Sequence, residues 1–164
     1  SQRTNHPFRR LTRDLFFPKK TLSYPLFGLG GFSDAVRQAM EQEGIVVLDE
    51  GMGGWWVTKR VTGPAKYDRY RREGFSGCLA VSKDQVLCYA YKKRQFHFAT
   101  DDPRIRDLYV DAPADDWLCI SSESSKFREQ WQGVMAYHFR TEKAFAFRSA
   151  LLDIGARRGR AAGK

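Results

Sequence analysis

The sequence of 164 residues lacks several features that define whole classes of protein. No apolar run approaches the roughly 20 residues needed to cross a bilayer, and residues 1–5 contain no hydrophobic signal region. Only three cysteines are present, Cys78, Cys88 and Cys119, and no pair of them has C-x-x-C spacing. These absences predict a soluble chain in a reducing, cytoplasmic compartment, and they argue against a disulfide-stapled scaffold.

Recognisable catalytic and cofactor-binding motifs are also absent. The sequence has no H-E-x-x-H or Cys/His spacing for zinc and no G-x-S-x-G for an acyl-transfer serine. The run Gly28-Leu-Gly-Gly31 follows no predicted strand and precedes no lysine in register, so it matches neither a dinucleotide fingerprint nor a phosphate loop. His6, His97 and His138 are better explained as surface or packed histidines than as bases. We therefore predict no catalytic residue, no metal and no cofactor.

What the sequence does contain is enough apolar material for one packed domain and a large excess of positive charge. Hydrophobic residues make up 42% of the chain and aromatic residues 14%. The formal net charge is +9, of which residues 1–32 carry +5 and residues 155–164 carry +4. Because the part between them is neutral, the two basic ends predict nucleic-acid or ribosome association as one alternative function.

Charge is also segregated within the neutral middle part. Residues 59–72 form a basic stretch with six cations against Asp68, expected to be a loop after a predicted strand that ends at residue 61, whereas residues 101–116 hold six aspartates against two arginines. An unevenly charged, solvated surface is the simplest interpretation, and a site for phosphate-bearing ligands is the functional one. The candidate ligand-binding residues are Lys59, Arg60, Lys66, Arg69, Arg71, Arg72, Lys92, Lys93 and Arg94.

Residues 1–44 are predicted to be an N-terminal extension with one short helix. Three prolines within residues 1–32 block a long helix, but the same segment is rich in aromatic residues. We expect it to wrap the domain or to dock on a partner or a membrane surface. Ser33 as an N-cap and Gly44 as a terminator predict a helix over residues 34–43.

From residue 45 the hydrophobic period changes to two, which is typical of strands. Residues 45–48 and 55–61 flank a glycine-rich segment, which predicts a hairpin or a strand with a sharp break. At least one of the adjacent tryptophans, Trp55 and Trp56, should face outward, where it would mark a binding surface unless a second packed layer covers it. The further predicted strands are residues 75–81, 86–91, 95–99, 106–111, 117–121 and 134–140.

Counting outward from Asp84 predicts the register of the hairpin 75–91. Leu79 then lies opposite Tyr89, and Val81 opposite Leu87. The same register puts Cys78 and Cys88 on a diagonal of one face at roughly 7–8 Å, beyond comfortable disulfide reach. We expect both to be packed thiols on a face of small residues that a helix or the N-terminal segment covers.

A helix is predicted over residues 142–158, where Ala144, Phe147, Leu151 and Ile154 form one apolar stripe. About seven short strands closed by such a helix resemble the pleckstrin-homology-like superfold and a group of uncharacterised bacterial proteins that contain it. The residues that carry the resemblance are 74–91, 96–102 and 139–145, and it covers about residues 45–158.

The resemblance implies an α+β fold, namely a partly open antiparallel barrel capped by the C-terminal helix. The chain would then divide into the extension 1–44, the barrel 45–158 and a basic tail 159–164. Some members of the superfold bind inositol phosphates, and Lys66, Arg69 and Arg71 match their basic pattern loosely, whereas others hold peptides.

The leading expectation is a non-catalytic binding module that recognises a protein partner or an anionic, phosphate-bearing surface, including peripheral binding to a membrane. Nucleic-acid association through the tails is an alternative, and so is a small-ligand barrel or an enzyme. An exposed sheet edge also leaves a homodimer open.

Overall fold

The computed structural model describes residues 18–21, 24 and 28–162. The helices are α3 (Asp34–Glu43), α4 (Ala144–Asp153) and the short 3₁₀ helices η1 (Pro103–Asp107) and η2 (Ser124–Lys126). The strands are β1 (Ile45–Gly63), β2 (Lys66–Ser82), β3 (Gln85–Ala90), β4 (Lys93–Ala99), β5 (Tyr109–Ala114), β6 (Trp117–Glu123), β7 (Gln132–Arg140) and β8 (Arg157–Arg158).

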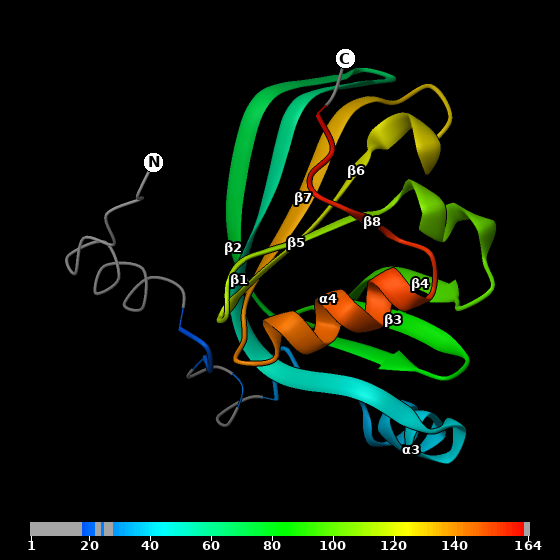
Figure 1. Cartoon of the computed structure of the whole chain (residues 1–164). Coiled ribbons are helices and arrows are strands. Elements are labelled where there is room, and N and C mark those ends of the chain that lie inside the picture. The colour runs from blue at the N-terminus through cyan, green and yellow to red at the C-terminus, as the bar shows by residue number, and fades with distance from the viewer. Residues whose placement is uncertain (1–17, 22–23, 25–27, 163–164) are drawn as a thin grey trace, which may run out of the picture.

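The described strands form one sheet that curls into a half-barrel (Figure 1). Their order is β4-β3-β2-β1-β7-β6-β5-β8, so the long β1–β2 hairpin lies in the middle. All neighbours are antiparallel except β5 and β8. Helix α4 lies across the concave side (Figure 1). The predicted α+β class with a partial barrel is confirmed.

Strand β1 is continuous but sharply bent, which confirms the second of the two alternatives for residues 45–61. Its register with β2 shifts between Asp49 and Met52, and Gly51 has a positive φ of 66°. Beyond the bend, β1 gains a second partner, because its pairing with β7 begins at Gly54. A Cβ on Gly54 would overlap the carbonyl oxygen of His138, so this close approach requires glycine.

At the bend, described residues of the N-terminal extension contact β1. Gly53 donates its N–H to the carbonyl of Pro18, and Thr21 donates to that of Gly51, each at 2.8 Å. Gly51 in turn donates to Gly30 at 2.8 Å. These residues therefore pack on the domain, as one of the two expectations for the extension had it, whereas residues 1–17, 22–23 and 25–27 lie outside the described part.

The main core fills the space between the concave side of the sheet and α4. It contains Leu79, Val81, Val86, Cys88, Phe139, Phe147 and Leu151 among its buried side chains. A second, smaller core lies on the opposite side of β2 and β3, where α3 covers them. It contains Phe32, Met40, Cys78, Ala80 and Leu87.

The predicted register of the β2–β3 hairpin is wrong by one residue. Leu79 pairs with Cys88 and Val81 with Val86, so Cys78 and Cys88 lie on opposite faces instead of on a shared diagonal. The cause is a shorter turn, because the Ser82 hydroxyl accepts the Gln85 N–H at 3.1 Å and starts β3 there. The cysteines are free and buried, and a helix covers the face with Cys78, as expected.

Two predicted boundaries near the C-terminal half are also wrong. The helix predicted over 142–158 ends at Asp153, because Gly155, with a φ of 117°, closes its last turn onto Leu152. Arg157 and Arg158 instead form β8 beside β5. The strand predicted to begin at residue 106 is preceded by η1, so it begins at Tyr109.

Replacing Gly54 with alanine tests whether the close approach of β1 to β7 just after the bend requires glycine. The added methyl group would overlap the His138 carbonyl and lie 2.8 Å from the Phe75 ring, so G54A should lower the free energy of unfolding by about 2 kcal/mol or more. Urea denaturation measures this. In the control G159A a Cβ meets nothing within 4 Å, and only its positive φ of 111° is strained. A G54A protein no less stable than G159A would contradict the proposed role of the bend.

Candidate functional site

Lys59 and Arg60 lie on β1, as the strand predicted over residues 55–61 requires, but the basic residues from Lys66 to Arg72 lie on β2 and not in a loop, which corrects the prediction. Successive side chains of a strand point to opposite faces, so the hairpin divides its cations between them. Lys59 pairs with Tyr70, and Val57 pairs with Arg72. Lys59, Tyr70 and Arg72 therefore share the face of the sheet that looks away from the main core, which we call the outer face.

The two adjacent tryptophans show the same division. The Arg72 guanidinium lies 5.0 Å from the Trp55 ring on the outer face, and the Arg71 guanidinium lies 5.9 Å from the Trp56 ring on the inner face. Arg69 shares the inner face with Arg71 by strand periodicity. The prediction that one tryptophan faces outward is therefore correct, but Trp55 is only 6% exposed and packs in a second layer.

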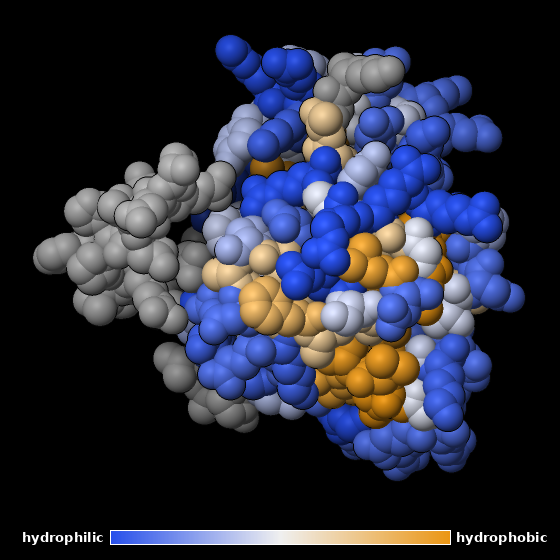
Figure 2. Space-filling view, viewed as in Figure 1, coloured by the Kyte–Doolittle hydropathy of each residue, from blue (hydrophilic) through white to orange (hydrophobic). Residues whose placement is uncertain are grey.

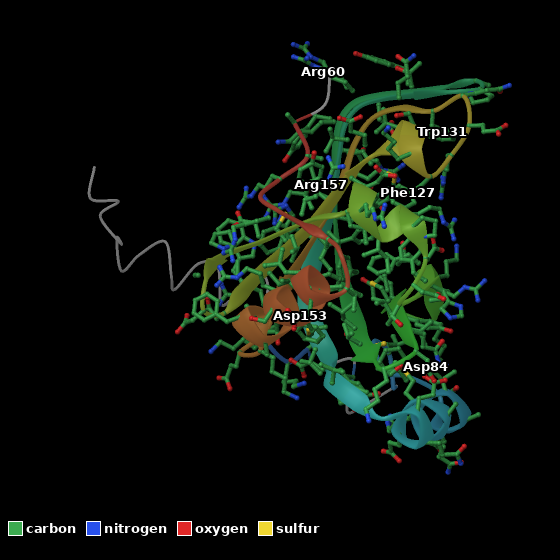
Figure 3. The ribbon with its side chains drawn as sticks, turned by 45° about the vertical axis from the view of Figure 1, so that its right-hand side comes forward. Arg60, Asp84, Phe127, Trp131, Asp153 and Arg157 are labelled. Atoms are coloured by element: carbon green, nitrogen blue, oxygen red, sulfur yellow. The ribbon has the colours of Figure 1, made fainter. Side chains whose placement is uncertain are left out.

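The other predicted cations lie apart from these. Arg60 is exposed near the end of the hairpin (Figure 3), and Lys92 and Lys93 are exposed at the β3–β4 turn. Arg94 lines a cavity on the concave side of the sheet. The side chain of Lys66 is outside the described part of the structure. The nine predicted residues thus do not form one site.

The outer face carries a cavity of about 280 Å³, which we call the outer pocket. It lies over β1, β2, β6 and β7, and the C-terminal segment closes one side. Its lining residues are Trp55, Val57, Lys59, Tyr70, Arg72, Trp117, Cys119, Ser121, Val134, Ala136, His138, Arg160 and Ala161.

The C-terminal segment reaches the outer pocket through specific contacts. The Ala161 N–H donates to the Ser121 hydroxyl at 2.9 Å, and the Arg160 Nε donates to Asp111 at 3.0 Å. The Arg160 guanidinium also lies 5.4 Å from the Trp117 ring. The structure therefore brings the basic end of the chain and the basic hairpin, which are about 90 residues apart in sequence, to one cavity.

His138 forms the floor of the outer pocket and is held by three side chains. Its ring stacks on Trp55 with centroids 4.7 Å apart, and the Trp117 Nε1–H donates to its Nδ1 at 3.0 Å. Because Nδ1 accepts that bond, the proton of the neutral ring sits on Nε2. Nε2 lies 3.8 Å from the Cys119 sulfur. The aromatic floor is therefore rigid.

This arrangement does not activate Cys119 as a nucleophile. A thiol needs an unprotonated imidazole nitrogen to take its proton, and the nitrogen that faces Cys119 already carries one. Burial also raises the pKa of Cys119 to about 11. Burial, helped by the positive charges of Arg160, Arg72 and Lys59, lowers the pKa of His138 to about 3. The pair is consequently a packed thiol beside a neutral histidine.

Several outer-pocket residues were missed by the sequence analysis. Tyr70 and Trp117 carried no motif, and Arg160 was assigned to a separate tail. Strand periodicity could have placed Lys59, Tyr70 and Arg72 together once residues 66–74 were recognised as a strand. No local signal places Arg160 there, because its position depends on pairing between distant segments.

The comparisons with known proteins add no assignment. No protein-family model matches the chain, and no curated protein matches it either. Among the described residues, no helix has the length and apolar character to cross a membrane. The same residues contain no group of three or more His, Cys, Asp or Glu side chains that could hold a metal ion.

The depressed pKa of His138 predicts a pH-dependent stability. Between about pH 6.5 and pH 3 the unfolded chain binds a proton at residue 138 that the folded chain does not. The free energy of unfolding should therefore decrease as the pH is lowered from about 6.5 to 3, with a slope from this group of up to about 1.4 kcal/mol per pH unit. Urea denaturation at a series of pH values measures it.

The variant H138N is the control, because an asparagine oxygen can replace Nδ1 as the acceptor for Trp117 without titrating. Its slope should be smaller by the contribution of His138. Equal slopes in the two proteins would show that His138 is not held neutral.

Proposed function

We propose that the protein is a non-catalytic binding module whose outer face binds single-stranded nucleic acid. The observation that carries this proposal is the convergence of Lys59, Arg72 and Arg160 on one cavity that also contains aromatic rings. Such a combination suits a flexible polyanion, because the cations neutralise phosphates while the rings offer surfaces on which bases stack.

The charge around the outer pocket favours a polyanion. The hairpin stretch 59–72 holds six cations and one acid, and residues 155–164 add four cations and no acid. Asp111 is the acidic partner of Arg160 in the described structure. Figure 2 shows hydrophilic side chains over the end of the molecule that carries this hairpin, with apolar surface gathered nearer β3, β4 and α4. A field of one sign steers anions to that end.

The rings distinguish a nucleic acid from a membrane surface. Tyr70 is 59% exposed on the same face as the cations, and Trp117 is half-buried beneath Arg160. Both rings lie among positive charges rather than at an apolar apex that could enter lipid. Tyrosine and tryptophan can stack with any base, which supports binding with little sequence preference.

The leading expectation of the sequence analysis is thereby narrowed to one kind of phosphate-bearing partner. The tail alternative and the hairpin alternative become one hypothesis, because Arg160 and the hairpin line the same pocket. We also assign the half-barrel of residues 45–158 to the pleckstrin-homology-like superfold. Consecutive antiparallel strands followed by a helix packed into the concave side support this assignment. Strand β8, parallel to β5, is an addition to that pattern.

A pair of double variants tests the proposal. K59Q/R72Q removes two charges from the outer face of the hairpin, and R69Q/R71Q removes two from the inner face of the same strands. Fluorescence anisotropy with labelled oligouridylate should show at least about tenfold weaker binding for K59Q/R72Q, since each lost charged contact weakens binding by 1 kcal/mol or more. The matched pair should lose much less.

Salt dependence provides a second readout from the same titrations. Each phosphate contact contributes about 0.7 to the slope of log K against log salt for single strands, so K59Q/R72Q should lower that slope by about 1.4. Thermal denaturation confirms that the variants are folded. Equal losses in both pairs, or binding to anionic vesicles with none to the oligonucleotide, would contradict the proposal.

A further inference from the structure

A second and larger cavity lies on the concave side of the sheet, opposite the outer pocket. Its volume is about 420 Å³, within the range of small-molecule sites. Strands β4, β6 and β7 form its walls together with η1 and the segment after η2. We call it the inner pocket. Figure 3 shows Phe127, one of its lining residues, below the end of the hairpin that carries Arg60.

The inner pocket has a nearly continuous aromatic wall. Phe96 packs edge-on against Tyr137 with ring centroids 5.7 Å apart and stacks on Phe98 at 5.7 Å. Phe98 contacts Phe127 at 5.6 Å. The four rings come from β4, β7 and the residue after η2, so the sheet fixes most of the wall. Flat rings held in this way favour a flat ligand.

Three guanidinium groups line the same cavity from three separate elements. Arg94 is the second residue of β4, Arg104 lies in η1 and Arg128 follows η2. Asp102 holds Arg104 through a two-pronged ion pair, and the Arg104 guanidinium lies 5.1 Å from the Phe98 ring. No aspartate or glutamate lines the described pocket. The net charge of the lining is therefore positive, which favours an anionic group on the ligand.

Unsatisfied polar groups lie beside this wall. The Trp56 Nε1–H and the Thr58 hydroxyl are buried and have no hydrogen-bond partner among the described residues. Thr58 is 3% exposed. Both are on the inner face of β1, where Trp56 pairs with Tyr137 and Thr58 with Met135, two residues that line the pocket. Buried polar groups without partners are rare. Neither residue lines the pocket itself, so the two groups mark polar surroundings behind the wall and are not part of the set of side chains that would touch a ligand.

We infer that the inner pocket binds a small planar anion, in which an aromatic ring carries a carboxylate, sulfonate or phosphate. The ring packs on the wall formed by Phe96, Phe98 and Tyr137. The anionic group is held by Arg94 and Arg128, with Arg104 beside them. The described linings of the two pockets share Ser121 alone, so this inference does not rest on the proposed nucleic-acid function.

The experiment uses the full chain and three pairs of probes. Naphthoate is compared with neutral naphthamide, adenosine monophosphate with adenosine, and each anion with inorganic phosphate. Binding is followed by the indole N–H signals of the four tryptophans in proton–nitrogen NMR spectra. The Trp56 signal reports the inner pocket, and the Trp117 signal reports the outer one.

At least one of the two ring-bearing anions, naphthoate or adenosine monophosphate, should shift the Trp56 signal. Tighter binding of naphthoate would indicate an aromatic carboxylate as the natural ligand, and tighter binding of adenosine monophosphate would indicate a nucleotide. Its neutral analogue and inorganic phosphate should each bind at least about tenfold more weakly, because each lacks one half of the recognition. The variant R94Q/R128Q should weaken the anion by about tenfold or more. R106Q/R148Q removes the same charge elsewhere and should change little.

Several results would overturn the inference. They are equal binding of the neutral analogue, an unchanged affinity in R94Q/R128Q with its fold intact by thermal denaturation, or no shift of the Trp56 signal at millimolar probe. A shift confined to Trp117 would place the anion in the outer pocket and would also exclude the inner site.

Discussion

The bend in β1 is the constraint on which the other features depend. Before it, β1 pairs with β2, and at the bend β1 also exchanges hydrogen bonds with the N-terminal segment. After it, β1 pairs with β2 and β7 together, and the sheet curls. Gly51 supplies the positive φ, and Gly54 allows β1 and β7 to approach closely. A straight strand of 19 residues would have extended a flat sheet without a concave side.

Side chains of the same strands point alternately to the outer face and to the concave side of the sheet, so these strands contribute to both surfaces. Odd-numbered positions of β1 place Trp55 and Lys59 on the outer face, while Trp56 and Thr58 face the concave side. Cations on both faces repel one another, and the structure offsets this locally. Arg71 pairs with Glu73, Arg160 pairs with Asp111, and Arg72 lies over an indole ring.

How much the sequence could predict depended on the range of the interactions involved. The helix over residues 34–43 was predicted to the residue, because its Ser33 cap and Gly44 terminator are local. The hairpin register failed because the Ser82 hydroxyl shortens a turn whose residues permit either length. The basic stretch was taken for a loop because charged residues and tyrosines obscured its period of two. Residues 67–72 are exposed at odd and even positions alike, apart from the half-buried Asp68, so no apolar alternation marks the strand.

The candidate site was predictable only in part, and for the same reason. Lys59 and Arg72 were recognised as cations, but their separation from Arg69 and Arg71 requires the strand assignment. The approach of Arg160 depends on where α4 ends and on the pairing of β8 with β5, which are tertiary outcomes. The sequence analysis grouped Arg94 with Lys92 and Lys93 in one turn. In the curled sheet, Arg94 lines the inner pocket and not the outer pocket.

The chemistry of the outer pocket follows from one neutral histidine among permanent cations. A protonated His138 would add a buried positive charge near Arg160, Arg72 and Lys59, and both burial and repulsion oppose this. The neutral ring therefore packs between Trp55 and Trp117 as an aromatic side chain and does not take up a proton. The proposed binding of a polyanion therefore rests on this aromatic floor and on the cations around it, and not on proton transfer at His138.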